Sequence, residues 1–258
     1  SAYRLKPILP VLTEDGRYAG PPGAGYSDRD NGVGLANDNR DDVINNLKVF
    51  GSVYLEAEII EGLNFRTNFG VDYDNIFTRD IFRTYSRGFL SNVIAELDHR
   101  QSHVANWVFN NTLTYNRQIG DHAFTVLAGT EAVENNVTLF FARAKEFALE
   151  TNAYFQLDAA SGERTSGGST TGFSLFSYFG KMNYAFQDKY LFSATVRRDG
   201  SSRFGLNNRY AVFPAFSVGW RLSEEAFLRD SDVISNLKIR GAWGSTGNQD
   251  ILNTARFS

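Results

Sequence analysis

The chain has 258 residues, a formal net charge of −3 and a pI near 5.7. This charge offers no large positive field of the kind that attracts nucleic acid, so nucleic acid is excluded as a partner. The lack of cysteine excludes disulfides and thiolate metal sites. Aromatic residues make up 14% of the chain, with 22 Phe and 12 Tyr against 5 Pro, and this balance predicts an all-β fold.

Hydropathy separates two ways of crossing a membrane. No run of 18 or more apolar residues exists, so a transmembrane helix is excluded by the length that the hydrocarbon requires. A barrel strand needs only about ten residues, of which alternate ones face lipid. The mean hydropathy of −0.31 is therefore compatible with a transmembrane barrel.

Residues 1–45 differ in composition from the rest. They contain Pro7, Pro10, Pro21 and Pro22 together with many Gly, Asn and Asp residues, which favour turns over regular pairing. We expect this stretch to be a long Pro/Gly-rich loop on the extracellular side. Residues 46–258 are expected to form antiparallel barrel strands.

Alternation of apolar and polar residues predicts about eight strands in that second part. They cover 46–59, 63–73, 106–116, a stretch from about 124, 173–186, 190–198, 210–222 and 237–244. The joins near 61, 120 and 188 are tight, that spanning 223–236 is moderate, and those over 74–103 and 137–171 are long. Short periplasmic turns and long outer loops are typical of transmembrane barrels. Soluble sheets also have one apolar and one polar face, so a soluble β protein remains an alternative.

Residues 184–205, YAFQDKYLFSATVRRDGSSRFG, resemble the most characteristic stretch of the SusC/RagA family of TonB-dependent receptors. The likeness continues in order and spacing through 208–225, 237–240 and 247–249. It is strongest between Phe173 and Gln249, and weaker but consistent over 54–63.

This resemblance implies that the eight strands are part of a larger 22-stranded barrel, a size at which the lumen must be plugged. The family's plug and energy-coupling segment are not in this sequence, so we expect a portion of a longer protein. It further implies an importer of glycan fragments or peptides in the cell outer membrane. Its partners would be a SusD-like surface lipoprotein, the TonB energy-coupling complex, outer-membrane lipid and an oligosaccharide or peptide substrate.

Two other functions stay open. The chain could be a soluble β-sheet protein whose long loops bind a carbohydrate or peptide, or a small self-contained membrane β-barrel. No catalytic motif is present, so we expect neither an enzyme nor a cofactor.

Five charged residues are candidates for contact with the lumen, the plug or the substrate. Arg197, Arg221 and Arg240 fall on the polar faces of neighbouring predicted strands, where they would form a basic stripe or pair with carboxylates. Asp199 and Arg203 flank Gly200-Ser201-Ser202. The segment 199–202 either touches plug or cargo or forms a turn in which Asp199 accepts backbone hydrogen bonds and Gly200 has a positive φ, and the turn is the favoured interpretation.

Two groups of side chains are of the kinds that can bind a metal. His99 and His103 are four residues apart without an evident third ligand, which favours two loop histidines. The first loop carries oxygen ligands that suit calcium, but without the EF-hand spacing, which favours a solvated loop. These residues are Asp28, Asp30, Asn31, Asp38, Asp41 and Asp42.

Aromatic residues near strand ends fit either an interfacial girdle or ordinary sheet packing. They are Tyr73, Trp107, Tyr115, Tyr190, Trp220 and Trp243. Residues 223–225 are expected to start a helical turn on the periplasmic side, because acidic residues favour a helix N-terminus.

Overall fold

The computed structural model describes residues 10–23, 30–229 and 233–249. It contains few helical turns and ten strands in that part of the chain. The helical elements are α1 (Gly32–Asp38), η2 (Asn39–Asp41), η3 (Leu206–Asn208) and η4 (Leu222–Glu224). The strands are β1 (Val43–Ile60), β2 (Leu63–Phe82), β3 (Tyr85–Arg87), β4 (Leu90–Asn92), β5 (Glu96–Ile119), β6 (His122–Lys145), β7 (Arg164–Phe186), β8 (Tyr190–Ser201), β9 (Tyr210–Arg221) and β10 (Lys238–Gly244).

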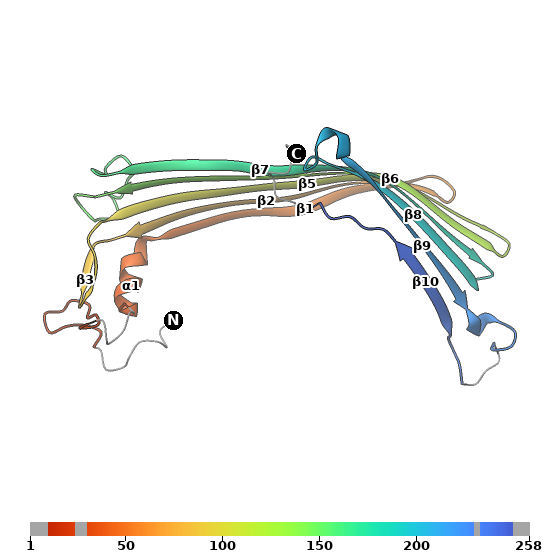
Figure 1. The fold of residues 1–258 in the computed structure, drawn as a ribbon, viewed down its shortest axis with the longest axis horizontal. Coiled ribbons are helices and arrows are strands. Elements are labelled where there is room, and N and C mark those ends of the chain that lie inside the picture. Colours follow the sequence, from red (N-terminus) through yellow and green to blue (C-terminus); the bar gives the residue numbers. More distant parts are fainter. Residues whose placement is uncertain (1–9, 24–29, 230–232, 250–258) are drawn as a thin grey trace. The chain divides into compact units, whose positions relative to one another are not determined.

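Eight of these strands form one sheet in the order β1-β2-β5-β6-β7-β8-β9-β10, so the strands of this sheet follow one another in the order of the sequence (Figure 1). Strands β3 and β4 form a separate antiparallel pair within the β2–β5 connection. The prediction of an all-β antiparallel fold with eight strands is confirmed.

Tight turns join the strands at one end. Gly62 and Gly120 adopt positive φ values of 78° and 54°, which glycine reaches without steric cost. A Cβ on Gly62 would lie 2.3 Å from the backbone oxygen of Asn116, so this turn also requires glycine for space. Gln187 and Asp188 both have φ of 54°, as the central residues of a type I′ turn do, and the N–H of Lys189 donates to the backbone oxygen of Phe186 at 3.0 Å.

Four strands extend further than the alternation predicted. β2 runs to Phe82 and β5 begins at Glu96, while β6 runs to Lys145 and β7 begins at Arg164. The loops expected over 74–103 and 137–171 are therefore shorter, at 83–95 and 146–163. These strand ends carry polar residues on both faces, which hides the two-residue period. The contrast between tight turns and longer connections remains, with one exception: the β9–β10 connection begins beside the tight turn 187–189 and is longer than the β8–β9 connection at the other end.

The first stretch is also more ordered than a loop. Within the described residues before 46 the chain forms α1 and η2, and β1 begins at Val43. Asn31 caps α1, because its side-chain oxygen accepts hydrogen bonds from the backbone N–H groups of Val33 and Gly34, both 3.1 Å.

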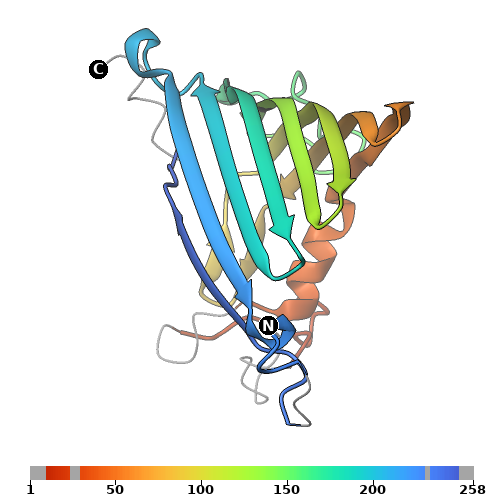
Figure 2. The ribbon, with the colours of Figure 1, turned by 90° about the vertical axis from the view of Figure 1, so that its right-hand side faces the viewer.

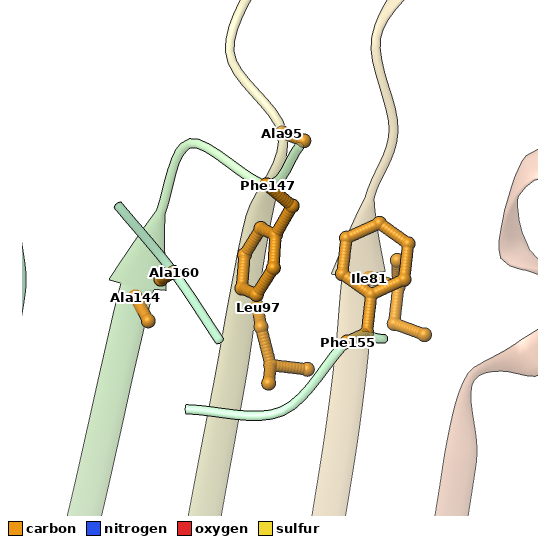
Figure 3. Close-up of a cluster of buried hydrophobic side chains, with 7 residues drawn as sticks. All are labelled: Ile81, Ala95, Leu97, Ala144, Phe147, Phe155 and Ala160. Carbon is orange, nitrogen blue, oxygen red and sulfur yellow. The ribbon is translucent and has the colours of Figure 1, made fainter. Parts of the chain in front are cut away.

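The chain divides into two compact units. Unit 1 comprises residues 1–48, 74–104 and 137–171, and unit 2 comprises 49–73, 105–136 and 172–258. Unit 1 contains a small hydrophobic core in which the rings of Phe147 and Phe155 lie 4.8 Å apart between centroids (Figure 3). Ile81 of β2 and Leu97 of β5 pack against them, and both are almost fully buried. The Phe155 side chain thus covers the ends of β2 and β5.

Unit 2 has two faces of different character. In the register of β7, β8 and β9, Arg197 is paired with Phe179 and Phe213, whereas its neighbour Val196 is paired with Gly180 and Pro214. Side chains alternate between faces along a strand, so these two sets lie on opposite sides. Strands β8, β9 and β10 lie side by side (Figure 2).

One side is here called the polar face. Its members on β7 to β10 include Ser177, Lys181, Asn183, Ser193, Thr195, Arg197, Asp199, Ser217, Arg221, Lys238 and Arg240. The other side is the apolar face. Its members include Tyr178, Met182, Phe192, Val196, Val212, Phe216, Val218, Trp220, Ile239 and Trp243. Ile239 is 60% exposed on it, as expected of a surface that needs an apolar environment.

Candidate functional site

Arg197 is the centre of a hydrogen-bonded network on the polar face of unit 2. Its guanidinium donates to Glu131 Oε1 on β6 and to Asp199 Oδ1 on β8, each at 2.6 Å, and to Ser177 Oγ on β7 at 2.8 Å. It also lies over the ring of Phe179, 5.5 Å from the centroid. Three neighbouring strands thus position one cation, because their register brings these residues to the same side.

The network corrects the interpretation of residues 199–202. β8 continues through Ser201, so Asp199 and Gly200 are strand residues and not a turn. Gly200 has no positive φ. A Cβ there would instead lie 2.3 Å from the ring of Tyr210, so glycine is required by the close approach of that ring. Of the two alternatives for Arg197, pairing with carboxylates is the one observed.

A hollow of about 790 Å³ lies on the polar face nearer the tight turns. Small residues such as Ser193, Ser217 and Gly219 form its floor, while Lys238 and Arg240 on β10 bring positive charge to it. The aliphatic part of the Lys238 side chain lies over Gly219, because glycine has no side chain to occupy that space. Within the described chain neither cation makes an ion pair. The hollow can therefore bind a carboxylate or another acceptor-rich group.

The five predicted residues do not form one cluster. Arg197 and Asp199 are joined, but Arg240 is opposite Gly219, which is itself opposite Leu191, six residues from Arg197 along β8. Six strand residues span roughly 20 Å. The structure therefore separates an Arg197 network from a hollow that contains Arg240.

Arg221 and Arg203 occupy further positions. Arg221 ends β9 opposite Lys238 on the polar face, and it has no ion pair with a described residue. Arg203 lies in the β8–β9 connection, where its guanidinium is 4.6 Å from the centroid of Phe173 and donates to the backbone oxygen of Gln249 at 3.2 Å. Arg203 therefore fixes a loop to the strand beside it.

Sequence reasoning missed Glu131, Ser177 and Lys238 as members of these sites. Lys238 shares the alternation that identified Arg240, so the pattern contained a signal for it. Glu131 and Ser177 lie on other strands, and only the register between strands brings them to Arg197. Register is not visible in a single strand's pattern.

Unit 1 contains a second set of arginines, on the segment that leaves β2. The side chain of Arg87 is 4% exposed and forms ion pairs with Asp30, at 2.7 Å, and with Asp38. It is flanked by the rings of Tyr18 and Tyr85, at 5.6 and 4.5 Å from their centroids. α1, which contains Asp38, lies next to β3 in Figure 1.

Asp41 and Asp42 also have partners at the end of β2 and just beyond it. Arg83 forms an ion pair with Asp41, and Asp42 Oδ1 accepts the backbone N–H of Ile81 at 2.8 Å. Burial raises the pKa of Asp42 above its ordinary value. The expectation of a solvated loop is wrong for these residues, because arginines and a backbone amide satisfy them. Asp28 lies outside the described residues.

No group of three or more His, Asp or Glu side chains suited to a metal occurs in the described part of the chain. His99 and His103 lie within β5, so their assignment to a loop is wrong. The ring of His99 packs edge-on against Phe77, with centroids 5.4 Å apart. His99 is thus a packed strand residue.

Glu225 joins the β9–β10 connection to aromatic residues at the strand ends. Its Oε1 accepts hydrogen bonds from Tyr190 Oη at 2.7 Å and Trp220 Nε1 at 3.0 Å, and its Oε2 lies 3.5 Å from Lys189 Nζ. The bond from Tyr190, followed by that from Trp220, holds the pKa of Glu225 below its usual range. Residues 222–224 form only the short turn η4, so the expected helix is a single turn.

No helix in the described residues is long and apolar enough to cross a membrane.

Several known proteins are similar to this chain, although no protein-family model matches it. TonB-dependent receptor P3 of Formosa agariphila is 33% identical over 264 residues, which cover 100% of this chain and 26% of that protein. TonB-dependent receptor SusC of Bacteroides thetaiotaomicron is 38% identical over 148 residues, 57% of this chain and 14% of SusC. The chain thus spans about a quarter of the length of the first of these relatives.

Solved structures agree on the fold. The structure of the RagAB peptide transporter matches with a TM-score of 0.79 at 24% identity, covering 93% of this chain and 27% of that one. The same importer in its open-open state matches with a TM-score of 0.78. The predicted resemblance to TonB-dependent receptors of the SusC/RagA type is confirmed.

Proposed function

Taking the chain as a barrel segment of a SusC/RagA-type TonB-dependent receptor, we propose that it forms part of the lumen wall of an outer-membrane nutrient importer. The observation that carries this proposal is the division of unit 2 into an exposed apolar face and a polar face with charged residues at mid-strand. A water-filled lumen accepts those charges, whereas a packed sheet interior would not.

In this proposal the apolar face contacts outer-membrane lipid and the tight turns lie on the periplasmic side. The longer connections 83–95, 146–163 and 202–209 then lie on the extracellular side, together with the ordered first stretch. The stacked rings of Tyr190 and Trp220, 6.3 Å apart, would belong to the periplasmic aromatic girdle.

The cargo in this proposal is a glycan fragment or a peptide. Relatives of the chain include a receptor named SusC and the subunit of a transporter described as importing peptides. A SusD-like surface lipoprotein would close the outer mouth, and the TonB complex would supply energy through parts of the receptor outside this chain. Nothing in the site suggests an enzyme.

The polar face would serve two tasks. The Arg197 network presents a partly exposed guanidinium, with the Glu131 carboxylate as a further hydrogen-bonding group, to cargo or plug. The hollow beside Lys238 and Arg240 would hold acidic or amide side chains of the plug, because both cations are available for charge-assisted hydrogen bonds.

The test uses the intact receptor that contains this segment. Arg197→Ala and the double variant Lys238→Gln, Arg240→Gln are expected to lower uptake of the receptor's glycan or peptide several-fold while the amount of barrel in the outer membrane stays constant. Val212→Ala on the apolar face is the matched control and should leave uptake unchanged. Normal uptake in both polar-face variants would contradict the lumen assignment.

A soluble binding protein is the rival function, and it predicts different behaviour of the purified receptor. An outer-membrane barrel requires detergent and migrates differently on a gel before and after boiling. A monodisperse monomer in aqueous buffer, without detergent, would contradict the membrane proposal.

A further inference from the structure

Arg198 is a charged residue on the apolar face of unit 2. It follows Arg197 in the chain, so its side chain lies on the opposite side of β8, paired across the sheet with Tyr178 and Val212. It is exposed, and its guanidinium lies over the ring of Tyr210, 4.4 Å from the centroid. Among the described residues it has no carboxylate partner, in contrast to Arg197.

A hollow of about 510 Å³ adjoins this arginine. Its lining includes the small residues Gly180 and Ala128, the larger side chains of Leu113, Tyr178 and Val196, and Arg198. By the strand register, Gly180 is paired with Val196 and Tyr178 with Arg198, so the hollow opens on the apolar face. It is lined mainly by apolar atoms and ends at one positive charge.

Packing within the chain does not explain why residue 180 of this hollow is a glycine. A Cβ on Gly180 would meet its nearest atoms, Leu127 O and Val196 Cγ1, at 3.7 and 3.9 Å, which are ordinary contacts. Gly180 also has no positive φ, and glycine within a strand weakens it. Neither packing nor backbone conformation therefore requires glycine at position 180. The effect of this glycine is to leave space in the hollow.

The height of Arg198 matches that of lipid headgroups. It lies eight residues along β8 from Tyr190, or about 26 Å along the strand, and a barrel tilt of about 40° reduces this to roughly 20 Å. The apolar band of such barrels is about 25 Å tall and bordered by aromatic residues, as Tyr178 and Tyr210 border Arg198 here. Arg198 is thus near the loop-side edge of that band.

We propose that this hollow binds one acyl chain of an outer-leaflet lipid, while the Arg198 guanidinium binds the anionic phosphate of the same lipid. A guanidinium fork matches phosphate oxygens in geometry and charge. The acyl chain fills the space above Gly180, which neighbouring side chains leave open. This proposal rests on the membrane placement of the barrel and is independent of cargo and transport.

The experiment measures lipid retained by the intact, detergent-purified receptor in native mass spectrometry. The probes are dioleoylphosphatidylglycerol and dioleoylglycerol, which share acyl chains and differ in the phosphate. The receptor is expected to retain the phospholipid, and Arg198→Ala to lower that retention about fivefold, the effect of one surface cation on an anionic lipid. Gly180→Leu, which fills the hollow, should lower it while Arg198 remains.

Lys181→Ala removes a cation from the polar face of the neighbouring strand and is the control, with unchanged retention expected. Equal retention by the receptor and Arg198→Ala, or no effect of Gly180→Leu, would overturn the proposal. Equal retention of dioleoylglycerol would do the same, because the phosphate would then be irrelevant. If Arg198→Ala fails to fold, Gly180→Leu decides alone. A heat-modifiable barrel that retains no lipid overturns only this inference and leaves the importer assignment intact.

Discussion

Arg87 in unit 1 and Arg197 in unit 2 each bind two carboxylates, yet the side chain of Arg87 is 4% exposed and that of Arg197 33%. Arg87 takes its partners from α1 and the residue before its cap, so it ties an N-terminal segment to the strand pair β3–β4. Arg197 takes its partners from strands of one sheet, which the backbone ladder already holds together.

The difference in exposure separates a structural from a binding role. A buried cation between two carboxylates leaves no site for a further ligand, and removing it leaves uncompensated buried charges. A partly exposed cation retains donors toward solvent and can exchange a water for a ligand. Substitutions at the two arginines and around them should therefore have effects of different size.

Removing Arg87 should have the largest effect. Arg87→Ala leaves Asp30 and Asp38 without their cation in a buried setting, and we expect a loss of about 3–5 kcal/mol in the stability of unit 1. Hydrogen exchange of the intact receptor should report this as faster exchange across residues 10–42. Arg17→Ala, which breaks the exposed pair with Asp15, is the control and should change exchange little.

The hydrophobic core of unit 1 provides the second prediction. Phe155→Ala removes a fully buried ring that packs on Phe147 and Ile81, and we expect a loss of about 3 kcal/mol. Exchange should rise at the ends of β2 and β5, measured on peptides that contain Ile81 and Leu97. Tyr154→Ala is matched in position but its side chain is 53% exposed, so a similar rise in that variant would contradict the core assignment.

These two regions differ in how far sequence could predict them. Strands of unit 2 alternate cleanly because one side faces an apolar and the other a polar environment, so the pattern identified all eight strands and the shared face of Arg197, Arg221 and Arg240. In unit 1 the ends of β2 and β6 carry polar residues on both sides. The alternation of apolar and polar residues therefore predicts strand ends near 73 and 137. The pairing of Arg87 with Asp30 joins residues 57 apart in sequence, which no local period encodes.

Arg197 should matter less for stability than Arg87. Arg197→Ala removes partly exposed ion pairs, and such pairs contribute at most about 1 kcal/mol because water and salt screen them. The thermal unfolding midpoint of the receptor should therefore shift only slightly while uptake falls. An unfolding shift as large as that of Arg87→Ala would contradict the contrast between the two clusters.

The smallest effect is expected at Glu225, where it depends on pH. The pKa of Glu225 is lowered in the folded chain, chiefly by the hydrogen bond from Tyr190. The carboxylate form therefore stabilises the folded state more than the protonated form does. The resulting stabilisation is complete above the ordinary carboxyl pKa and is lost as pH falls through the lowered folded value. Glu225→Gln should remove this pH dependence, because the amide does not titrate. Hydrogen exchange over residues 220–229, compared between receptor and variant at each pH, measures it. Tyr190, Trp220 and Lys189 surround this carboxylate in unit 2. If the ratio of exchange rates between the receptor and Glu225→Gln stays constant down to acidic pH, the contacts of these residues with Glu225 do not stabilise the turn.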